Sequence, residues 1–453
     1  MSTLATLKAD LNPNTRRALL ASMLGSLVEW YDYALYGAAA SLVIGPLFFG
    51  QMESGSTIAA FATFAVGFVA RPLGGLLIAW LGDRRGRKPA MLLTIIIMGI
   101  STVGIGLLPT AEHLGVWSVV LLVILRLLQG LGAGAELTGA LTLVAEYTPV
   151  QRRGFWTSLV LSMPPAGSLL ATLAFMLVSG LPEETFRGWG WRLPFLLSAV
   201  LFAVAIFIRN KLEESPEYRA AMAQQEQKKE ALKVPLADVL RTNFKQVLIG
   251  FMAVTGHNAN NYIISIVSIT VMINYGGLSR SDALMLVMLA TIFGVVLSPV
   301  GGALGDKLGA GKVMLLGSVT GLIFAFPLFT ALTSGSFLLI FCALSISFGV
   351  VLATTSGPQG AFLVNLFPIK TRFTGVALAR ELNGVVIAGF TPMIVAALFE
   401  FGQGSIVLPS LYMATCFAVT VVATLWAKDS GNNSAAQVVP AVNGWDPELS
   451  SKV

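Results

Sequence analysis

The stretch Gly-Ser-Leu-Val-Glu-Trp-Tyr-Asp-Tyr-Ala-Leu-Tyr-Gly, residues 25–37, lies within an apolar run that carries no charge besides Glu29 and Asp32. On a helix, Glu29, Asp32, Tyr33 and Tyr36 are spaced i, i+3, i+4 and i+7, so they share one face. A charge at the centre of a membrane-length helix costs about 2.5–3.5 kcal/mol on insertion scales unless it meets water, protein or a counter-charge. The two carboxyls therefore indicate a function, and a buried ion pair that only orients helices is the alternative.

Composition places the chain in a membrane. Of its 453 residues, 55% are hydrophobic and 11% are charged, whereas a soluble protein has about 25% charged residues. The net charge of +6 resides largely in short loops, which is typical of membrane topology and not of a nucleic-acid partner. The first residues lack the apolar core of a signal peptide. Cys342 and Cys416 lie in apolar runs with no metal-ligand spacing, so we expect no metal and no cofactor.

The apolar runs are long enough for twelve membrane-spanning helices. They lie near residues 19–48, 57–81, 90–109, 116–146, 155–180, 191–208, 245–274, 281–304, 313–332, 336–361, 374–398 and 406–427. Threaded alternately, they put most Lys and Arg residues on the side of both termini, whereas Arg187 and Arg280 lie opposite. The positive-inside rule then predicts that both termini are cytoplasmic.

The spans divide six and six. We predict an N-terminal half over 1–208, a cytoplasmic central loop over 209–244, a C-terminal half over 245–428 and a disordered tail over 429–453. The central loop is interpreted as a surface helix or solvated linker, with a regulatory site as the alternative. Gly82-Asp83 after span two recurs as Gly305-Asp306 after span eight. The repeat predicts two parallel six-helix halves with a ligand between them.

The loop after span two has a mechanical interpretation. Its glycines permit a tight turn, and Asp83 is suited to bond backbone N–H groups at a facing helix N-terminus. We expect this loop and its second copy to set the inward/outward balance, through Gly82, Asp83, Arg84, Gly86, Arg87, Lys88 and Asp306.

Other polar groups lie inside the apolar runs. Span four carries Arg126, Gln129 and Glu136 along one side. Span seven has a polar cluster that is expensive at mid-membrane unless it lines a cavity, namely His257, Asn258, Asn260, Asn261 and Tyr262. Ser162, Met163, Pro164 and Pro165 predict a broken or kinked helix in span five. For Arg71, anion binding, gating and a structural role all stay open.

Several motifs resemble the major facilitator superfamily and, within it, the metabolite:proton symporter family. They are Glu29-Trp30-Tyr31-Asp32-Tyr33, Arg71-Pro72-Leu73-Gly74-Gly75, the loop from Gly82 to Lys88, Arg126-Leu127-Leu128-Gln129-Gly130, Trp189 to Phe195, and Glu213-Glu214-Ser215-Pro216-Glu217. The resemblance implies the twelve-helix fold, all-α, and a role in proton coupling for Arg126, with Asp32 or Glu29 as counter-charge. Ala379-Arg380-Glu381 departs from the Gly-Tyr-Gln pattern usual in that family.

These observations predict a proton-coupled symporter of the bacterial cytoplasmic membrane, acting as a monomer, that imports a small organic acid anion by alternating access. Glu29, Asp32, Arg126 and Glu136 are the candidates for proton coupling. The substrate-binding candidates are Arg126, Tyr33, Tyr36, Gln129, His257, Asn258, Asn261, Tyr262 and Arg380. The alternatives are a symporter of a betaine-like or proline-like zwitterion, an exporter of a drug or metabolite, a channel, and a membrane enzyme. The last two fit poorly, since no filter-like segment and no nucleophile–base pair is evident.

Overall fold

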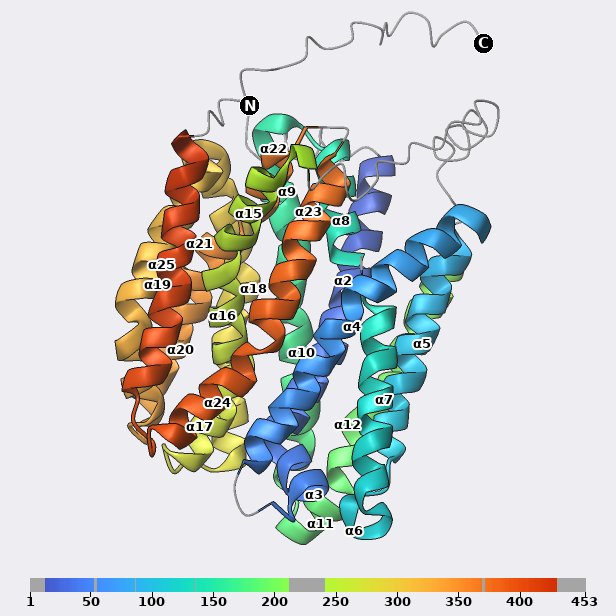
Figure 1. The fold of residues 1–453 in the computed structure, drawn as a ribbon, viewed down its shortest axis with the longest axis vertical. Helices are drawn as coiled ribbons and strands as arrows, with labels where there is room; N and C mark the ends of the chain where they lie inside the picture. The colour runs from blue at the N-terminus through green and yellow to red at the C-terminus, as the bar shows by residue number, and fades with distance from the viewer. Residues whose placement is uncertain are drawn as a thin grey trace, which may run out of the picture.

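The computed structural model describes residues 13–52, 55–85, 87–134, 136–211, 241–368 and 371–429. These residues form one bundle of long helices (Figure 1). The first half of the chain, blue to green, lies mainly on the right in that view, and the second half, yellow to red, lies mainly on the left.

The described part of the first half forms six membrane-length segments joined by short helices. The segments are α2–η1–α3 (Pro13–Ala39, Ala40–Ile44, Gly45–Phe49), α4 (Ser56–Arg85), α5 (Arg87–Leu107), α7–α8 (Val116–Gly132, Glu136–Tyr147), α9–α10 (Arg153–Leu161, Met163–Ser179) and α12 (Leu193–Lys211). The connections contain α6 (Ala111–Leu114), η2 (Val150–Arg152), α11 (Glu183–Gly188) and η3 (Gly190–Arg192).

The second half repeats this arrangement. Its described segments are α15–α16–η4–α17 (Phe244–Ala253, Thr255–Tyr262, Ile263–Val267, Ser268–Asn274), α18 (Arg280–Leu308), α19 (Ala310–Leu332), α20–η5–α21–α22 (Phe337–Ile346, Ser347–Leu352, Ala353–Ser356, Gln359–Leu366), α23–η6–α24 (Arg372–Asn383, Gly384–Gly389, Thr391–Phe401) and α25 (Val407–Asp429). The prediction of twelve spans in two six-helix halves is confirmed.

Ten of the described helices are long and apolar enough to cross a membrane, and Leu92–Leu107 of α5 is a shorter apolar helix. The segment from Phe244 to Asn274 is not among the ten, because it is interrupted at Val254 and carries the polar stretch Thr255–Tyr262. Irregular backbone and polar side chains at membrane depth are tolerated where protein or a cavity surrounds them, and most residues of Thr255–Tyr262 are buried in the bundle.

Proline and arginine shape the first half locally. The fifth span breaks at Ser162, between α9 and α10, as Pro164 and Pro165 predict, because proline supplies no N–H to the preceding turn. Arg192, in the Trp-Arg motif, donates to the carbonyls of Gly106 at 3.0 Å and Leu108 at 2.5 Å. It thereby satisfies the last turn of α5.

The two ends of the bundle are named here by the elements they carry. At the terminal end, α2 begins and α25 ends; at the distal end lie α3, α6, α11 and α17 (Figure 1). The halves meet at both ends. Toward the distal end α10 packs on α18 and α4 packs on α24, and toward the terminal end α9 packs on α18 and α22.

Two glycines near the terminal end allow the backbones of the two halves to meet. A Cβ on Gly154 of α9 would lie 2.5 Å from the carbonyl oxygen of Gly302, and one on Gly302 of α18 would lie 2.4 Å from that of Gly154. These distances leave no room for a side chain, so α9 and α18 contact each other backbone to backbone.

Parts of the predicted organisation lie outside the described residues. Of the central loop 209–244, the structure describes the last turn of α12 through Lys211 and the segment from Arg241. Of the tail 429–453, it describes Asp429. The predicted boundaries of the two halves stay predictions.

Candidate functional site

Asp32 lies inside the first half, between α2, α5 and α7. Its carboxylate accepts hydrogen bonds from the Thr102 hydroxyl and, at 2.6 Å, from Gln129 Nε2. Gln129 also donates to Thr102 at 3.0 Å and accepts from Arg126. Asp32, Gln129 and Arg126 are each 0% exposed. A continuous network thus joins the carboxyl to a guanidinium through one amide.

Arg126 is held by groups of its own half. Its Nε donates to the carbonyl of Thr63 at 3.2 Å and its Nη2 to that of Phe64 at 3.0 Å. Its guanidinium carbon lies 3.9 Å from the centroid of the Tyr36 ring, whose hydroxyl lies 2.5 Å from the Thr63 hydroxyl. Gly67 leaves room for this guanidinium, since a Cβ there would lie 2.7 Å from Nη2.

A second charged group joins the halves. Arg71 of α4 forms an ion pair with Glu29 of α2 at 3.0 Å and binds Glu381 of α23 through Nε at 3.2 Å and Nη2 at 3.4 Å. The side chains of Glu29, Arg71 and Glu381 are 1%, 6% and 15% exposed. Opening the interface between α4 and α23 requires the Arg71–Glu381 contact to break.

Aromatic rings from both halves surround this ion group. We call Trp30, Tyr33, Phe64, Phe68 and Tyr262 the aromatic cluster. Tyr262, from the second half, stacks on Trp30 with 6.2 Å between centroids and meets Phe64 and Phe68 edge-on at 5.7 and 5.6 Å. The guanidinium carbon of Arg71 lies 5.2 Å from the Tyr33 centroid and 5.4 Å from that of Phe68.

Three buried polar groups of the aromatic cluster have no hydrogen-bond partner among the described residues. They are Trp30 Nε1, the Tyr33 hydroxyl and the Tyr262 hydroxyl. Buried polar groups in proteins are normally bonded, so these unpaired groups are free to bond a ligand at the interface.

The polar cluster of the seventh span bonds mainly to the tenth and eleventh spans. His257 lies 3.2 Å from the Thr355 hydroxyl, and Asn258 donates to Asn383 at 2.6 Å. In the eleventh span, Arg380 donates to Gln359 at 2.6 Å, and the Nε2 of Gln359 has no partner among the described residues. Asn261 is 6% exposed, and its carbonyl accepts from Ser265.

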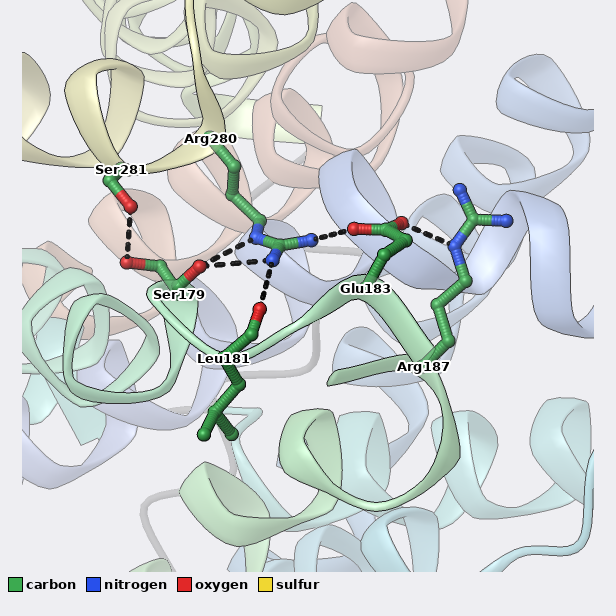
Figure 2. Close-up of polar contacts among 6 residues, drawn as sticks. All are labelled: Ser179, Leu181, Glu183, Arg187, Arg280 and Ser281. Carbon is green, nitrogen blue, oxygen red and sulfur yellow. Dashed lines mark hydrogen bonds and ion pairs between the residues drawn. The ribbon is translucent and has the colours of Figure 1, made fainter. Parts of the chain in front are cut away.

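At the distal end, α18 of the second half is bonded to the loop between α10 and α11 of the first. Figure 2 shows Arg280 between Ser179, Leu181 and Glu183, and Ser281 beside Ser179. Arg280 donates to the carbonyl of Ser179 at 2.9 and 3.3 Å, to that of Leu181 at 3.4 Å and to Glu183 at 2.8 Å.

Glu183 also binds Arg187, at 2.5 Å (Figure 2). Burial alone would raise the pKa of the Glu183 carboxyl, but the hydrogen bonds from Arg187 and Arg280 outweigh it and lower the pKa below its ordinary value of 4.5. Glu183 is therefore ionised at neutral pH.

At the terminal end, Asp306 crosses between the halves. Its carboxylate accepts from the backbone N–H of Gly154 at 2.7 Å and of Phe155 at 2.8 Å, at the start of α9. This is the helix N-terminal contact that the sequence suggested for the loop aspartate, here made by the second copy. In the first copy, α4 runs through Asp83 to Arg85 and α5 begins at Arg87. The side chains of Asp83, Arg84, Arg87 and Lys88, and all of Gly86, lie outside the described residues.

The structure corrects one expectation about neighbours. Glu29 and Asp32 do not share surroundings: Glu29 pairs with Arg71 beside the second half, whereas Asp32 faces α5 and α7. Arg126 hydrogen-bonds Gln129 and two carbonyls, and Gln129 lies between it and Asp32, with which its charge interacts. Tyr33 and Tyr36 flank the two guanidinium groups as side chains of the same helix. The side chain of Glu136 lies outside the described residues.

Some partners were missed by sequence reasoning. Thr102, Gln359 and Asn383 each bond a predicted site residue. Gln359 and Asn383 are amides inside apolar runs, a signal that could have found them. Thr102 gave no comparable signal, since hydroxyls commonly bond their own helix.

The comparisons with known proteins agree with this architecture. Residues 18–239 match the family model described as "Sugar (and other) transporter". The inner membrane metabolite transport protein YhjE of Escherichia coli K12 is 34% identical over 428 residues, covering 92% of this chain and 95% of that protein. The shikimate transporter of the same strain is 34% identical, covering 92% and 95%. Its proline/betaine transporter is 34% identical, covering 94% and 86%.

Solved structures share the fold. A D-xylose–proton symporter superposes with a TM-score of 0.70 at 20% identity, covering 90% of this chain and 96% of that chain. Another such symporter structure is described as one of the major facilitator superfamily. With twelve spans in two halves, and relatives of this identity along nearly the whole length, the chain is a membrane transporter and not an enzyme, and it belongs to the family of major facilitator transporters that includes these metabolite, shikimate and proline/betaine transporters.

Proposed function

We propose that this transporter is a proton-coupled symporter that imports a small organic acid anion by alternating access between its two halves. The observation that carries the proposal is Asp32, a carboxyl with no exposure that is linked through Gln129 to Arg126. Arg126 lies on the proton-coupling position that the family resemblance implies. A carboxyl so enclosed is suited to carry a proton, because burial disfavours its charged form.

The balance of buried charges supports a proton that travels with an anion. Among the side chains that the structure describes, those buried between the spans include the arginines 71, 126 and 380 and the carboxylates Glu29, Asp32 and Glu381, and the formal charges of these six cancel. A bound carboxylate would leave one negative charge in excess. Protonation of Asp32 restores neutrality, which matters where the dielectric is low.

Recognition of the remaining substrate groups is proposed for polar residues of the seventh span and for one tyrosine of the first. His257, Asn258, Asn261 and Tyr262 are proposed to bond hydroxyl or carbonyl groups, and Tyr33 to pack against the carbon skeleton. Gln129, Tyr36 and Arg126 are proposed to act on the proton side, since Gln129 bonds both Asp32 and Arg126 and the guanidinium of Arg126 lies over the Tyr36 ring, all inside the first half.

A zwitterion such as a betaine or proline is the second candidate. The aromatic cluster favours it, because rings next to two carboxylates are suited to bind a quaternary ammonium. The relatives include proline/betaine transporters of Escherichia coli and Salmonella typhimurium. Both candidates share a carboxylate and differ in net charge.

Uptake into proteoliposomes tests the proposal. We expect a proton gradient directed into the vesicles to drive saturable accumulation of shikimate. An uncoupler should abolish this accumulation. One proton with a monoanion carries no net charge, whereas one proton with a zwitterion moves one positive charge, for which the membrane potential contributes about 2.3 kcal/mol per 100 mV. Glycine betaine uptake with a transport current would select the second candidate. Transport of neither solute with protons, or efflux alone, would refute import of these classes.

Topology belongs to the same proposal. We infer that the terminal end faces the cytoplasm of a bacterial inner membrane and that the chain acts as a monomer. Labelling of single cysteines at Arg16 and Val116, which lie at opposite ends and are exposed, tests the orientation in intact cells. The loop from Gly82 to Lys88 is proposed to control opening of the terminal end, together with Asp306.

A further inference from the structure

We propose that Arg71 binds the carboxylate of the transported solute, and that Glu381 occupies that position while no solute is bound. This deepens the proposed function and rests on it, because both candidate solute classes carry a carboxylate. Glu381 meets Arg71 through two nitrogens, at 3.2 and 3.4 Å. This is the bidentate geometry in which arginine recognises a free carboxylate.

The two acids on Arg71 differ in origin. Glu29 comes from the same half as Arg71 and is 1% exposed, whereas Glu381 comes from the other half and is 15% exposed. When the halves separate, Glu29 moves with Arg71 and Glu381 moves away. Arg71 therefore has one permanent carboxylate partner and one exchangeable partner.

The surroundings of Arg71 are prepared for a ligand. Its guanidinium lies against the rings of Tyr33 and Phe68. The neighbouring hydroxyls of Tyr33 and Tyr262 and the indole N–H of Trp30 are buried without a partner among the described residues. A solute carboxylate beside Arg71 would have donors at hand for its remaining lone pairs and rings for its carbon atoms.

The other two arginines are less suited to this role. Arg126 directs its guanidinium to carbonyls and an amide of its own half, and its guanidinium carbon lies over the Tyr36 ring. Arg380 donates to Gln359 within the second half. Neither is bound by a carboxylate of the opposite half in the described structure, so neither offers an exchangeable position.

The displaced Glu381 has a partner next to it. Arg380 precedes it in α23, and the two charges interact. Gln359, already bonded to Arg380, has an unpaired Nε2. Solute binding would thus transfer Glu381 from Arg71 to Arg380 and remove a contact between the halves, which links loading of the site to opening at the α4–α23 interface.

Binding measured by calorimetry in detergent tests this exchange. The probes are shikimate, glycine betaine and acetate, with methyl shikimate and choline as analogues that lack a carboxylate. Glu381→Gln removes the competing charge, so we expect it to tighten binding of the carboxylate probes by roughly tenfold, the size of one charge-assisted hydrogen bond. Arg71→Gln should weaken it at least as much, and neither variant should alter binding of the analogues.

Glu183→Gln is the matched control, because it also removes a carboxylate from an ion pair between the halves, at the distal end. It should leave the preference for carboxylate over analogue unchanged. The inference is overturned if folded Glu381→Gln binds no carboxylate probe, binds them no tighter than wild type, or changes carboxylates and analogues alike. Should Arg71→Gln fail to fold, the comparison between Glu381→Gln and Glu183→Gln decides. Proton-driven uptake by the wild type tests the proposed function separately.

Discussion

Removing Arg280 should open the distal end far more than removing its acidic partner. The side chain of Arg280 connects the second half to the first and is 17% exposed, whereas that of Glu183 is 57% exposed. An exposed ion pair contributes about 0.2–1 kcal/mol, so Glu183→Gln should shift the equilibrium toward the distal-open state by at most about fivefold.

The larger share lies in the other contacts of Arg280. Its bonds to the carbonyls of Ser179 and Leu181 are charge-assisted, and its guanidinium carbon lies 3.6 Å from the Phe186 ring centroid. The carbonyls are hydrated again when the loop opens, which offsets part of the cost. We therefore take about 2 kcal/mol for the loss of these Arg280 contacts. This corresponds to about a 30-fold shift for Arg280→Ala.

Spin-label distances measure this equilibrium. In a background with Cys342 and Cys416 replaced by serine, labels at Val116 and Phe401 report the separation of the halves at the distal end, where both residues are exposed. Arg280→Ala should populate a longer distance and Glu183→Gln should change it little. Equal effects of the two variants would refute the assignment of the energy to the carbonyl contacts.

The pH dependence follows from the lowered pKa of Glu183. A carboxylate whose pKa is lowered by an ion pair stabilises the closed distal end fully at pH values above its ordinary pKa of 4.5. This stabilisation is lost as the pH falls through the lowered pKa. The distal distance should therefore be constant between about pH 5 and 8 with respect to this group. A transition near neutral pH that disappears in Glu183→Gln would contradict the assignment.

Four further changes test the remaining assignments. Asp32→Asn should abolish proton-driven accumulation and leave solute exchange, measured as counterflow; normal accumulation would exclude Asp32 as the proton carrier. Asp306→Asn removes a charged cap shared by two N–H groups and should weaken closure of the terminal end by about 1 kcal/mol, seen as a lower transport rate at unchanged affinity, and Asp83→Asn should behave alike. Gly302→Val should hold the terminal end open, because its Cβ collides with the Gly154 backbone; an unchanged distance between labels at Val150 and Leu308 would count against this.

Features that depend on one segment alone were readable from the sequence. Hydropathy predicted the spans, the paired prolines predicted the break at Ser162, and the polar stretch marked Thr255–Tyr262 as unusual. The repeat of the Gly-Asp motif indicated two parallel halves. These features depend on transfer of side chains into lipid and on local backbone geometry, both of which neighbouring residues determine.

The pairing of charges was decided by tertiary structure. Glu29 and Asp32 are three residues apart, so on a helix they point about 60° apart. Packing turns one toward Arg71 and the other toward Gln129. The bond between Arg71 and Glu381 joins residues 310 positions apart. Such partners depend on how each helix is rotated about its axis, and this rotation is set by the contacts of glycines and rings between helices, which a single sequence does not reveal.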